Sequence, residues 1–413
     1  MKILIIGNGF DKAHGLPTGY KDFIGYIEEF IGYFVDGDDY ECSEGMVKLS
    51  RTMDLLGYKP EFISLIQNNA WIEYFIERQS FLGDKWIDCE EEIKVIIALF
   101  ELRYKGPEDI EKINIDNWSA DHFRKVFNNI CMRLNAQNEN EQVANKYSSI
   151  PIEEMFIHLR SFTRAFEIYC LCINQATNEY ATKHNLKDAA IKQHISKQAN
   201  TNTIITDANS ILTTTIYDCI LSFNYTRTYE NMYGLDENNK QKLDSTRYCY
   251  IHGIAQSDAK EINMVLGIDD TLYGNESRSF FSYAKFKKYF QRILFKTGSE
   301  YRDWINSIEQ RAPNNLFNVH DVHIIGHSIG STDHEVLKEF FDVWCHNNKV
   351  RITVFYHDAE SEIRVIENTI RMLGRDEVIQ RVRGRDWTIR FANQYDKNVG
   401  IMKHHEELEH QIW

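Results

Sequence analysis

Apolar segments of strand length stand at both ends of this chain, and helical patterns fill the stretch between them. Lys2 to Ile6 is an apolar, β-branched run that ends at a glycine, which is typical of a buried strand in a parallel sheet. From about residue 20 to 180, apolar side chains recur at helical spacing. After residue 214, short apolar runs alternate with helical patterns. The runs expected to form strands there are Thr215–Leu221, Tyr248–Ile251, Met264–Leu266, Val322–Ile325, Ile352–Tyr356 and Trp387–Phe391.

This alternation predicts an α/β fold with a Rossmann-like parallel sheet and a large α-helical insert after its first strand. Residues 1–19 and 211–395 would form the nucleotide-binding core, residues 20–210 the insert, and residues 396–413 a C-terminal tail. The first helix of the insert is expected to follow Thr18 as its N-cap. Helices of the second half are expected over about 281–294, 333–346 and 359–372.

Composition narrows the class of protein. The chain has 413 residues, 43% of them hydrophobic, which is enough to bury a sizeable core. Its 47 Lys and Arg against 61 Asp and Glu give a net charge of −14, which argues against general binding to nucleic acid or to an anionic membrane. The eight cysteines include no C-x-x-C pair, so no metal site is predicted. Without a signal sequence or an apolar stretch near the ~20 residues of a membrane span, we expect a soluble, cytoplasmic protein.

Four polar or glycine-rich turns follow the expected strands. Ligands of open α/β sheets bind beyond the carboxyl ends of the strands, so these turns are expected to share one edge of the sheet and to form a nucleotide pocket. The turns are Gly7-Asn8-Gly9-Phe10-Asp11, Ser222-Phe223-Asn224-Tyr225-Thr226, His252-Gly253 and Gly326-His327-Ser328-Ile329-Gly330.

The first turn has two interpretations. A G-x-G turn after a strand lets backbone N–H groups approach a phosphate, but it is equally typical of a tight turn that needs glycine. The full G-x-G-x-x-G pattern is absent because Lys12 stands at its last position. Asp11 brings a negative charge to the turn, where it would either cap the next turn or bond a ribose hydroxyl.

Asn224 and His252 are the candidate catalytic residues. A carboxamide donates and accepts hydrogen bonds at once, so Asn224 could hold a ribose, and the alternative is an asparagine at a left-handed turn. His252 could act as a general base toward water or a sugar hydroxyl, or it could bond a backbone carbonyl. His327 is either a ligand contact or structural, and Asp333 is interpreted as a charge at the start of a helix.

Residues Gly326 to Gly330 also match G-x-S-x-G, the nucleophile elbow of serine hydrolases. That elbow needs a helix directly after it, and here Ser331-Thr332-Asp333 delays the helix. The pattern therefore favours a nucleotide contact over a hydrolase triad.

These segments together resemble the AbiH family of bacteriophage abortive-infection proteins, from residue 1 to about 375. The resemblance implies a role in bacterial defence against phage, in which infected cells stop growing or die. The segments that carry it are Gly7-Asn8-Gly9-Phe10-Asp11, His14-Gly15-Leu16-Pro17-Thr18, Tyr20, Phe23, Trp86-Ile87-Asp88-Cys89-Glu90, Phe223-Asn224-Tyr225-Thr226, Ile251-His252-Gly253, Gly267-Ile268-Asp269 and Gly326-His327-Ser328.

A more distant resemblance, to the sirtuin-like fold, implies the chemistry. The order of glycine loop, Asn-containing loop, His-Gly and Gly-x-Ser is similar to that of sirtuins, which bind NAD. The resemblance implies that Asn224 lies near the nicotinamide ribose and that His252 is the general base. Sirtuins that deacylate proteins carry a four-cysteine zinc module, which this sequence lacks, so the resemblance favours NAD hydrolysis over deacylation. The implied nucleotide contacts are Gly7, Asn8, Gly9, Phe10, Asp11, Tyr225, Thr226, Gly326, His327 and Ser328.

Three functions follow from the sequence. The first is an abortive-infection effector that hydrolyses NAD to nicotinamide and ADP-ribose, and the second is a nucleotide-sensing or partner-binding module without turnover. The third is an RNA-cleaving toxin, for which the acidic balance is unfavourable; its basic segment, Lys285, Lys287, Lys288 and Arg292, is interpreted as a solvated helix face. A phage-derived trigger, a partner defence protein and a homo-oligomer are left open. So is Glu90, which would either reach the pocket or anchor helices as an i, i+4 pair with Trp86.

Overall fold

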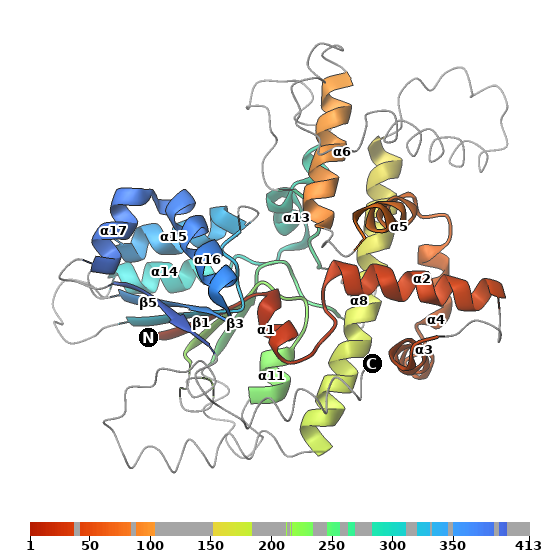
Figure 1. Ribbon diagram of the computed structural model, residues 1–413, viewed down its shortest axis with the longest axis horizontal. Coiled ribbons are helices and arrows are strands. Elements are labelled where there is room, and N and C mark those ends of the chain that lie inside the picture. Colours follow the sequence, from red (N-terminus) through yellow and green to blue (C-terminus); the bar gives the residue numbers. More distant parts are fainter. Residues whose placement is uncertain are drawn as a thin grey trace.

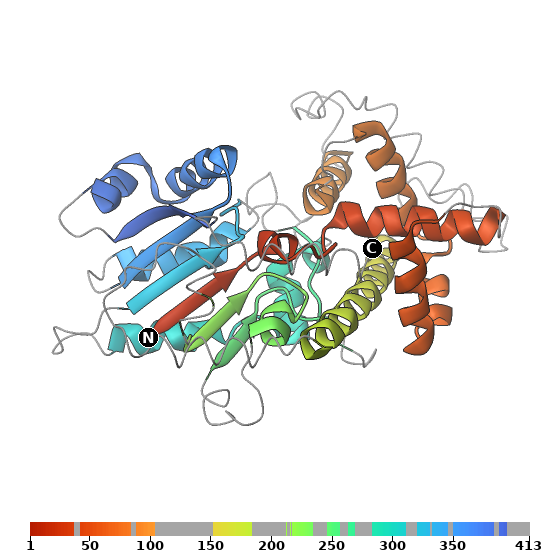
Figure 2. The same cartoon turned by 60° about the horizontal axis from the view of Figure 1, so that its bottom comes forward.

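A parallel sheet and a separate group of helices make up the protein (Figure 1). Figure 2 shows the two parts meeting at one edge of the sheet, with the first helix, α1 (Asn8–Ala13), between them. The computed structural model describes residues 1–36, 42–83, 88–103, 152–183, 212, 215, 217–233, 246–256, 263–268, 283–310, 320–330, 333–345, 350–383 and 388–394.

In the described part of the chain the sheet has six strands in the order β3-β2-β1-β4-β5-β6, and every neighbouring pair is parallel. This is the strand order of Rossmann-type sheets, so the predicted fold class is confirmed. The order reverses at β1, which pairs with β2 on one side and with β4 on the other. The strands are β1 (Lys2–Ile6), β2 (Cys219–Ser222), β3 (Arg247–Tyr250), β4 (His320–Ile325), β5 (Val350–Tyr356) and β6 (Ile389–Asn393).

Both faces of β1 are buried. Ile3 and Ile5 belong to one hydrophobic cluster, and Leu4 and Ile6 belong to another that includes Phe10. Side chains of a strand point alternately to opposite faces, so a strand covered on both faces is apolar without interruption. This two-sided burial explains the unbroken apolar run that the sequence shows at Lys2 to Ile6.

Helices cover the sheet and follow its strands. The helices expected near 333–346 and 359–372 are α15 and α16. The one expected over 281–294 is a 3-10 turn, η7 (Ala284–Phe286), followed by α13. Three further helices, α11, α14 and α17, were not expected from the sequence. The bounds are α11 (Thr228–Tyr233), α13 (Lys288–Phe295), α14 (Tyr301–Gln310), α15 (His334–Cys345), α16 (Ala359–Leu373) and α17 (Arg375–Arg383).

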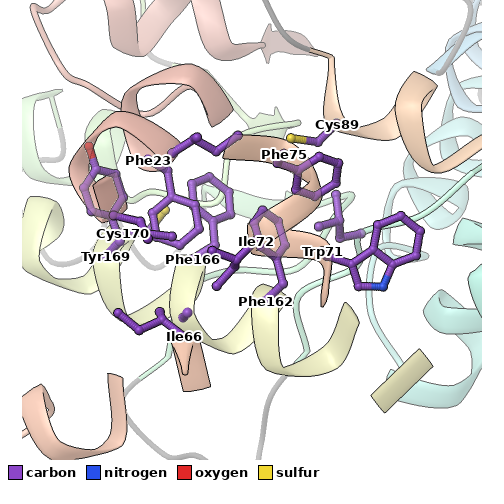
Figure 3. Close-up of a cluster of buried hydrophobic side chains, with 14 of the residues drawn as sticks. Phe23, Ile66, Trp71, Ile72, Phe75, Cys89, Phe162, Phe166, Tyr169 and Cys170 are labelled. Carbon is purple, nitrogen blue, oxygen red and sulfur yellow. The ribbon is translucent and has the colours of Figure 1, made fainter. Parts of the chain in front are cut away.

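Among the described residues, six helices that follow α1 and precede β2 form the helical body, which packs around the long helix α8 (Figure 1). Figure 3 shows its aromatic centre, where the Phe23 ring centroid lies 5.5 Å from that of Phe162 and 5.0 Å from that of Phe166. No helix in the described ranges has the length and apolarity that crossing a bilayer requires. The domain boundaries proposed from the sequence stay predictions. The helices are α2 (Tyr20–Asp36), α3 (Glu44–Leu55), α4 (Lys59–Ile66), α5 (Ala70–Leu82), α6 (Cys89–Arg103) and α8 (Ile152–Lys183).

Met264 to Leu266, expected to be a strand, has no regular secondary structure and lies outside the sheet. Its polar backbone groups find other partners. Val265 N–H donates to the carbonyl of His252 at 2.8 Å, and the Gln291 carboxamide bonds both the N–H and the carbonyl of Leu266. The Gln291 side chain thus makes the hydrogen bonds that a neighbouring strand would make in a sheet. Met264 and Leu266 pack in the core of the helical body.

Other expected boundaries shift. The strand expected from Thr215 begins at Cys219, and Trp387, the expected start of the last strand, lies outside the described residues. The first turn is helical, because α1 (Asn8–Ala13) begins directly after β1. Thr18 was wrong as an N-cap: its hydroxyl donates to Asn8 Oδ1 at 2.8 Å, and Gly19 N–H bonds the Asp22 carboxylate at the start of α2.

The turns after β1 and β4 touch through backbone atoms. Gly9 N–H donates to the carbonyl of Gly326 at 2.8 Å, and a Cβ at Gly9 would lie 2.8 Å from that same oxygen. Gly326 has a φ of +65°, and a Cβ on it would collide with the amide of Phe10. Glycine is therefore required at both positions by the close approach of the two strands' ends.

We predict that Gly326→Ala destabilises the protein by about 3 kcal/mol, which combines left-handed backbone strain with steric overlap. Gly57→Ala is the matched control, since Gly57 has a φ of +77° but open space around its Cα. It should lose only the strain, about 1–2 kcal/mol. Urea denaturation of both variants measures the difference, and equal losses would contradict the steric argument.

Candidate functional site

A cavity of about 530 Å³ lies at the carboxyl ends of the strands and is lined both by the strand-end turns and by the helical body. All four turns contribute to its wall, as expected from the sequence. Phe10 instead lies behind the wall, 1% exposed, with its ring centroid 4.6 Å from that of His14. The other sequence-predicted residues all line the cavity: Gly7, Asn8, Gly9, Asp11, Asn224, Tyr225, Thr226, His252, Gly326, His327 and Ser328.

The amides of the glycine turn are already engaged within the fold. Gly7 N–H donates to the carbonyl of Ile325 at 3.2 Å, and Gly9 N–H to that of Gly326 at 2.8 Å. Phe10 N–H closes the turn on the Gly7 carbonyl at 2.8 Å. The glycines therefore serve the contact between β1 and β4, and a ligand of this wall would meet the Asn8 side chain and the glycine surfaces rather than these three N–H groups.

Asp11 orients Asn224. The Asp11 carboxyl is fully buried; its Oδ1 accepts from Asn224 Nδ2 at 3.0 Å and its Oδ2 from the Thr226 hydroxyl. Burial raises the pKa of Asp11, and the hydrogen bonds from the threonines and Asn224 oppose that rise. With its amide nitrogen held, Asn224 is left with a buried Oδ1 that has no hydrogen-bond partner among the described residues. The carboxamide thus keeps an unused acceptor at the cavity wall.

His252 is held in one tautomer. Its Nε2 lies 3.1 Å from Asp333 Oδ1, and its Nδ1 is buried without a partner in the described part of the chain. Burial, followed by the charge of Lys288, lowers the pKa of His252 to about 4. The ring is therefore neutral near pH 7. Because Asp333 accepts the Nε2 proton, the lone pair is on Nδ1.

Asp333 joins two histidines. Its Oδ2 lies 3.3 Å from His327 Nε2, and His327 Nδ1 accepts the N–H of Ile329 at 2.9 Å. That bond leaves the proton of His327 on Nε2, facing Asp333. Burial raises the pKa of Asp333, but the Lys288 charge and the two histidines outweigh it, so the pKa is well below its usual value. The interpretation of Asp333 as a mere helix-terminal charge was incomplete.

Glu90 reaches the cavity from the helical body. Its carboxylate lies 2.6 Å from Lys288 Nζ, and Lys288 also lies 3.5 Å from Asp333 Oδ1. Burial raises the pKa of Glu90 to about 8, although the Lys288 charge opposes this. Trp86, the other half of the i, i+4 alternative, lies outside the described residues. Lys287 and Lys288 are each 1% exposed, so the interpretation of the basic segment as a solvated helix face was wrong for both.

Two tyrosines connect the helical body to the turn after β2. The Tyr20 hydroxyl lies 3.4 Å from Glu90 Oε1 and 3.2 Å from the Tyr225 hydroxyl. Tyr225 in turn donates to the Val265 carbonyl at 2.9 Å. This wall of the cavity is therefore polar at its hydroxyls and apolar at its rings.

Sequence reasoning missed a whole side of the cavity. The missed residues lie at the carboxyl ends of β5 and β6 or on the first turns of α16, and Arg364 among them brings a cation to the cavity wall. The signal that could have found them is the rule used for the other strands, since β5 and β6 end at the same edge. They are Tyr356, His357, Ser361, Arg364, Val365 and Gln394.

Comparison with known proteins finds one family. The sequence model of the family described as "Bacteriophage abortive infection AbiH" matches residues 3–356, which is most of the chain. No curated protein and no solved structure matches the chain. The sirtuin-like part of the resemblance therefore stays a prediction.

We predict that His252 makes the protein acid-sensitive in a defined window. Its pKa is about 4 in the fold against 6.5 ordinarily, so between these values the unfolded chain binds more protons than the folded one. The free energy of unfolding therefore falls as the pH drops from 6.5 to 4 and is unaffected by His252 above 6.5. Over this window the wild type should lose about 2 kcal/mol more than His252→Gln in urea titrations. Parallel curves for the two proteins would refute a neutral, buried His252.

We predict that the stability lost in Asn224→Asp is largely regained when Asp11→Asn is added to it. Asn224→Asp places two buried acceptors face to face and should cost about 2–4 kcal/mol at pH 7. Adding Asp11→Asn restores a donor and an acceptor, so the double variant should regain most of that loss. Urea denaturation at pH 7 measures both, and a double variant as unstable as the single one would rule out this bond as the orienting contact.

Proposed function

Because the chain belongs to the bacteriophage abortive infection AbiH family, whose role is in defence against phage, we propose that it is an effector that hydrolyses NAD to nicotinamide and ADP-ribose. One observation carries the proposal. Two buried polar atoms without a described partner, Asn224 Oδ1 and His252 Nδ1, belong to residues that line one cavity. That cavity lies beyond the carboxyl ends of the strands in a sheet of Rossmann order, the place where such sheets bind dinucleotides.

The reaction suits a weak base. When the bond between C1′ of the ribose and the nicotinamide nitrogen breaks, nicotinamide leaves neutral with the electron pair, so no acid has to protonate it. A water oxygen then bonds to the positively charged C1′ carbon and becomes strongly acidic. His252 Nδ1, whose pKa is about 4, needs only to accept this acidic proton. The products are nicotinamide and ADP-ribose.

Asn224 and the acidic groups have complementary roles in this proposal. The Asn224 Oδ1 would accept a hydrogen bond from the ribose or from the attacking water, since Asp11 already holds its nitrogen. Asp333 keeps a negative charge beside His252, and that charge stabilises both the positive C1′ and the imidazolium formed on proton transfer. The cavity polarity thus favours a cationic transition state.

The two alternatives differ in what supports them. Nucleotide sensing without turnover needs only the cavity. RNA cleavage needs an exposed basic surface, whereas Lys287 and Lys288 are buried and Lys285 is paired with Glu153. NAD hydrolysis uses the two unpartnered atoms as well as the cavity. A phage-derived trigger and a partner defence protein remain part of the proposal.

We predict that the purified protein, with extract of phage-infected cells supplying the trigger, releases nicotinamide from NAD. Asn224→Ala and His252→Ala should each reduce the rate by at least about 100-fold, the usual contribution of a positioned base. Chromatographic measurement of nicotinamide tests this directly.

The matched control is His323→Gln. His323 is a half-buried histidine whose pKa burial likewise lowers to about 4, but it belongs to β4 and bonds the Tyr217 hydroxyl at 2.8 Å. This variant should keep wild-type turnover. Undiminished nicotinamide release in both site variants would overturn the assignment, and NAD binding without release would favour the sensing alternative.

A further inference from the structure

A buried lysine connects the helical body to the histidine of the cavity. Lys288 is the first residue of α13 and is 1% exposed. Its Nζ lies 2.6 Å from Glu90 on α6 and 3.5 Å from Asp333, and Asp333 lies 3.1 Å from His252 Nε2. An unbroken series of polar contacts therefore runs from a helix of the helical body to a turn of the sheet.

The fold fixes the place of Lys288 independently of its charge. Its N–H donates to the Ile268 carbonyl at 2.8 Å, and Lys287 forms a bridge with Ile268. Gln291, one turn further on α13, holds both backbone groups of Leu266. Burying an ammonium group is costly unless carboxylates lie close to it. Packing alone therefore does not explain a buried lysine at this position.

We propose that Lys288 is a positioning residue for His252: its charge balances that of Asp333, so that His252 stays neutral, holds its proton on Nε2 and keeps a free lone pair on Nδ1. Only the use of that lone pair rests on the proposed NAD hydrolysis. The electrostatic arrangement stands on the contacts alone.

The physical argument is one of competing charges. Asp333 by itself would draw a second proton onto His252 and convert it to an imidazolium, whose Nδ1 has no lone pair to accept a proton. Lys288 opposes this, because a second cation beside His252 is unfavourable. The groups that face this cluster are Lys288 and Arg292 from α13, Asp333 before α15, Glu90 from α6, His327 after β4 and Tyr225 after β2.

The test is a titration of His252 by NMR in protein labelled with ¹³C at the histidine ring, without NAD. His252→Gln identifies the His252 signal. Two neutral replacements, Lys288→Met and Lys288→Gln, should raise the pKa of His252 by on the order of one pH unit or more. Both variants should fold, because Glu90, whose pKa is about 8, carries a proton near neutral pH and is therefore not left as an unpaired buried charge when its cation is removed.

Two further variants separate charge from packing. Lys288→Arg keeps the charge and should leave the His252 titration close to that of the wild type. Lys287→Met removes the neighbouring buried lysine and should also leave it unchanged. An unshifted His252 in a folded neutral variant, or an equal shift in Lys287→Met, would overturn the proposal.

The outcome is independent of whether NAD is the substrate. If the protein hydrolyses NAD, the acidic limb of the kcat/KM profile should move with the His252 titration in the neutral variants. If it does not, the NMR shift still decides the role of Lys288. Failure of the positioning role and failure of the proposed function are therefore distinguishable.

Discussion

The site depends on the close backbone approach of two turns at the point where the strand order reverses. The Gly9 N–H donates to the Gly326 carbonyl at 2.8 Å, and neither glycine has room for a Cβ. This contact fixes the end of β1 against the end of β4. Asp11, two residues beyond Gly9, consequently lies under Asn224, and His327, next to Gly326, faces Asp333. A packing requirement of the backbone thus sets the positions of the polar groups on both sides.

Burial then determines how those groups are charged. Near neutral pH, His252 is uncharged because burial lowers its pKa, and burial favours the protonated form of Glu90. Asp333 stays ionised because a lysine and two histidines surround it. The buried cluster therefore holds a cation, Lys288, against an anion, Asp333, and it keeps a neutral histidine whose Nδ1 has no partner among the described residues. Low dielectric and pairing together produce this state, and neither produces it alone.

The helical body is part of the site. Glu90 and Tyr20 reach the cavity from helices that the chain inserts between β1 and β2, and Tyr225 meets them from the sheet side. Part of the cavity wall could be predicted from the sequence. Parallel strands end at one edge of a sheet, and this rule placed the turns with Asn224 and His252 at one cavity. Asp333 and Lys288 could not be found that way, because their partners are far away in the sequence. Local pattern carries no information about such pairs.

The sequence by itself determined the class of fold, the position of the helical insert, the family and the four turns, because hydrophobic period and strand-end glycines are local properties. Only the tertiary structure decided what these turns do. It showed that the glycine amides bond the end of β4 and the turn after it, that Asp11 holds the Asn224 carboxamide, and that Lys288 of the basic segment is buried beside two carboxylates. Each of these depends on which distant groups share a small, water-poor volume, and that is set by packing rather than by the order of residues along the chain.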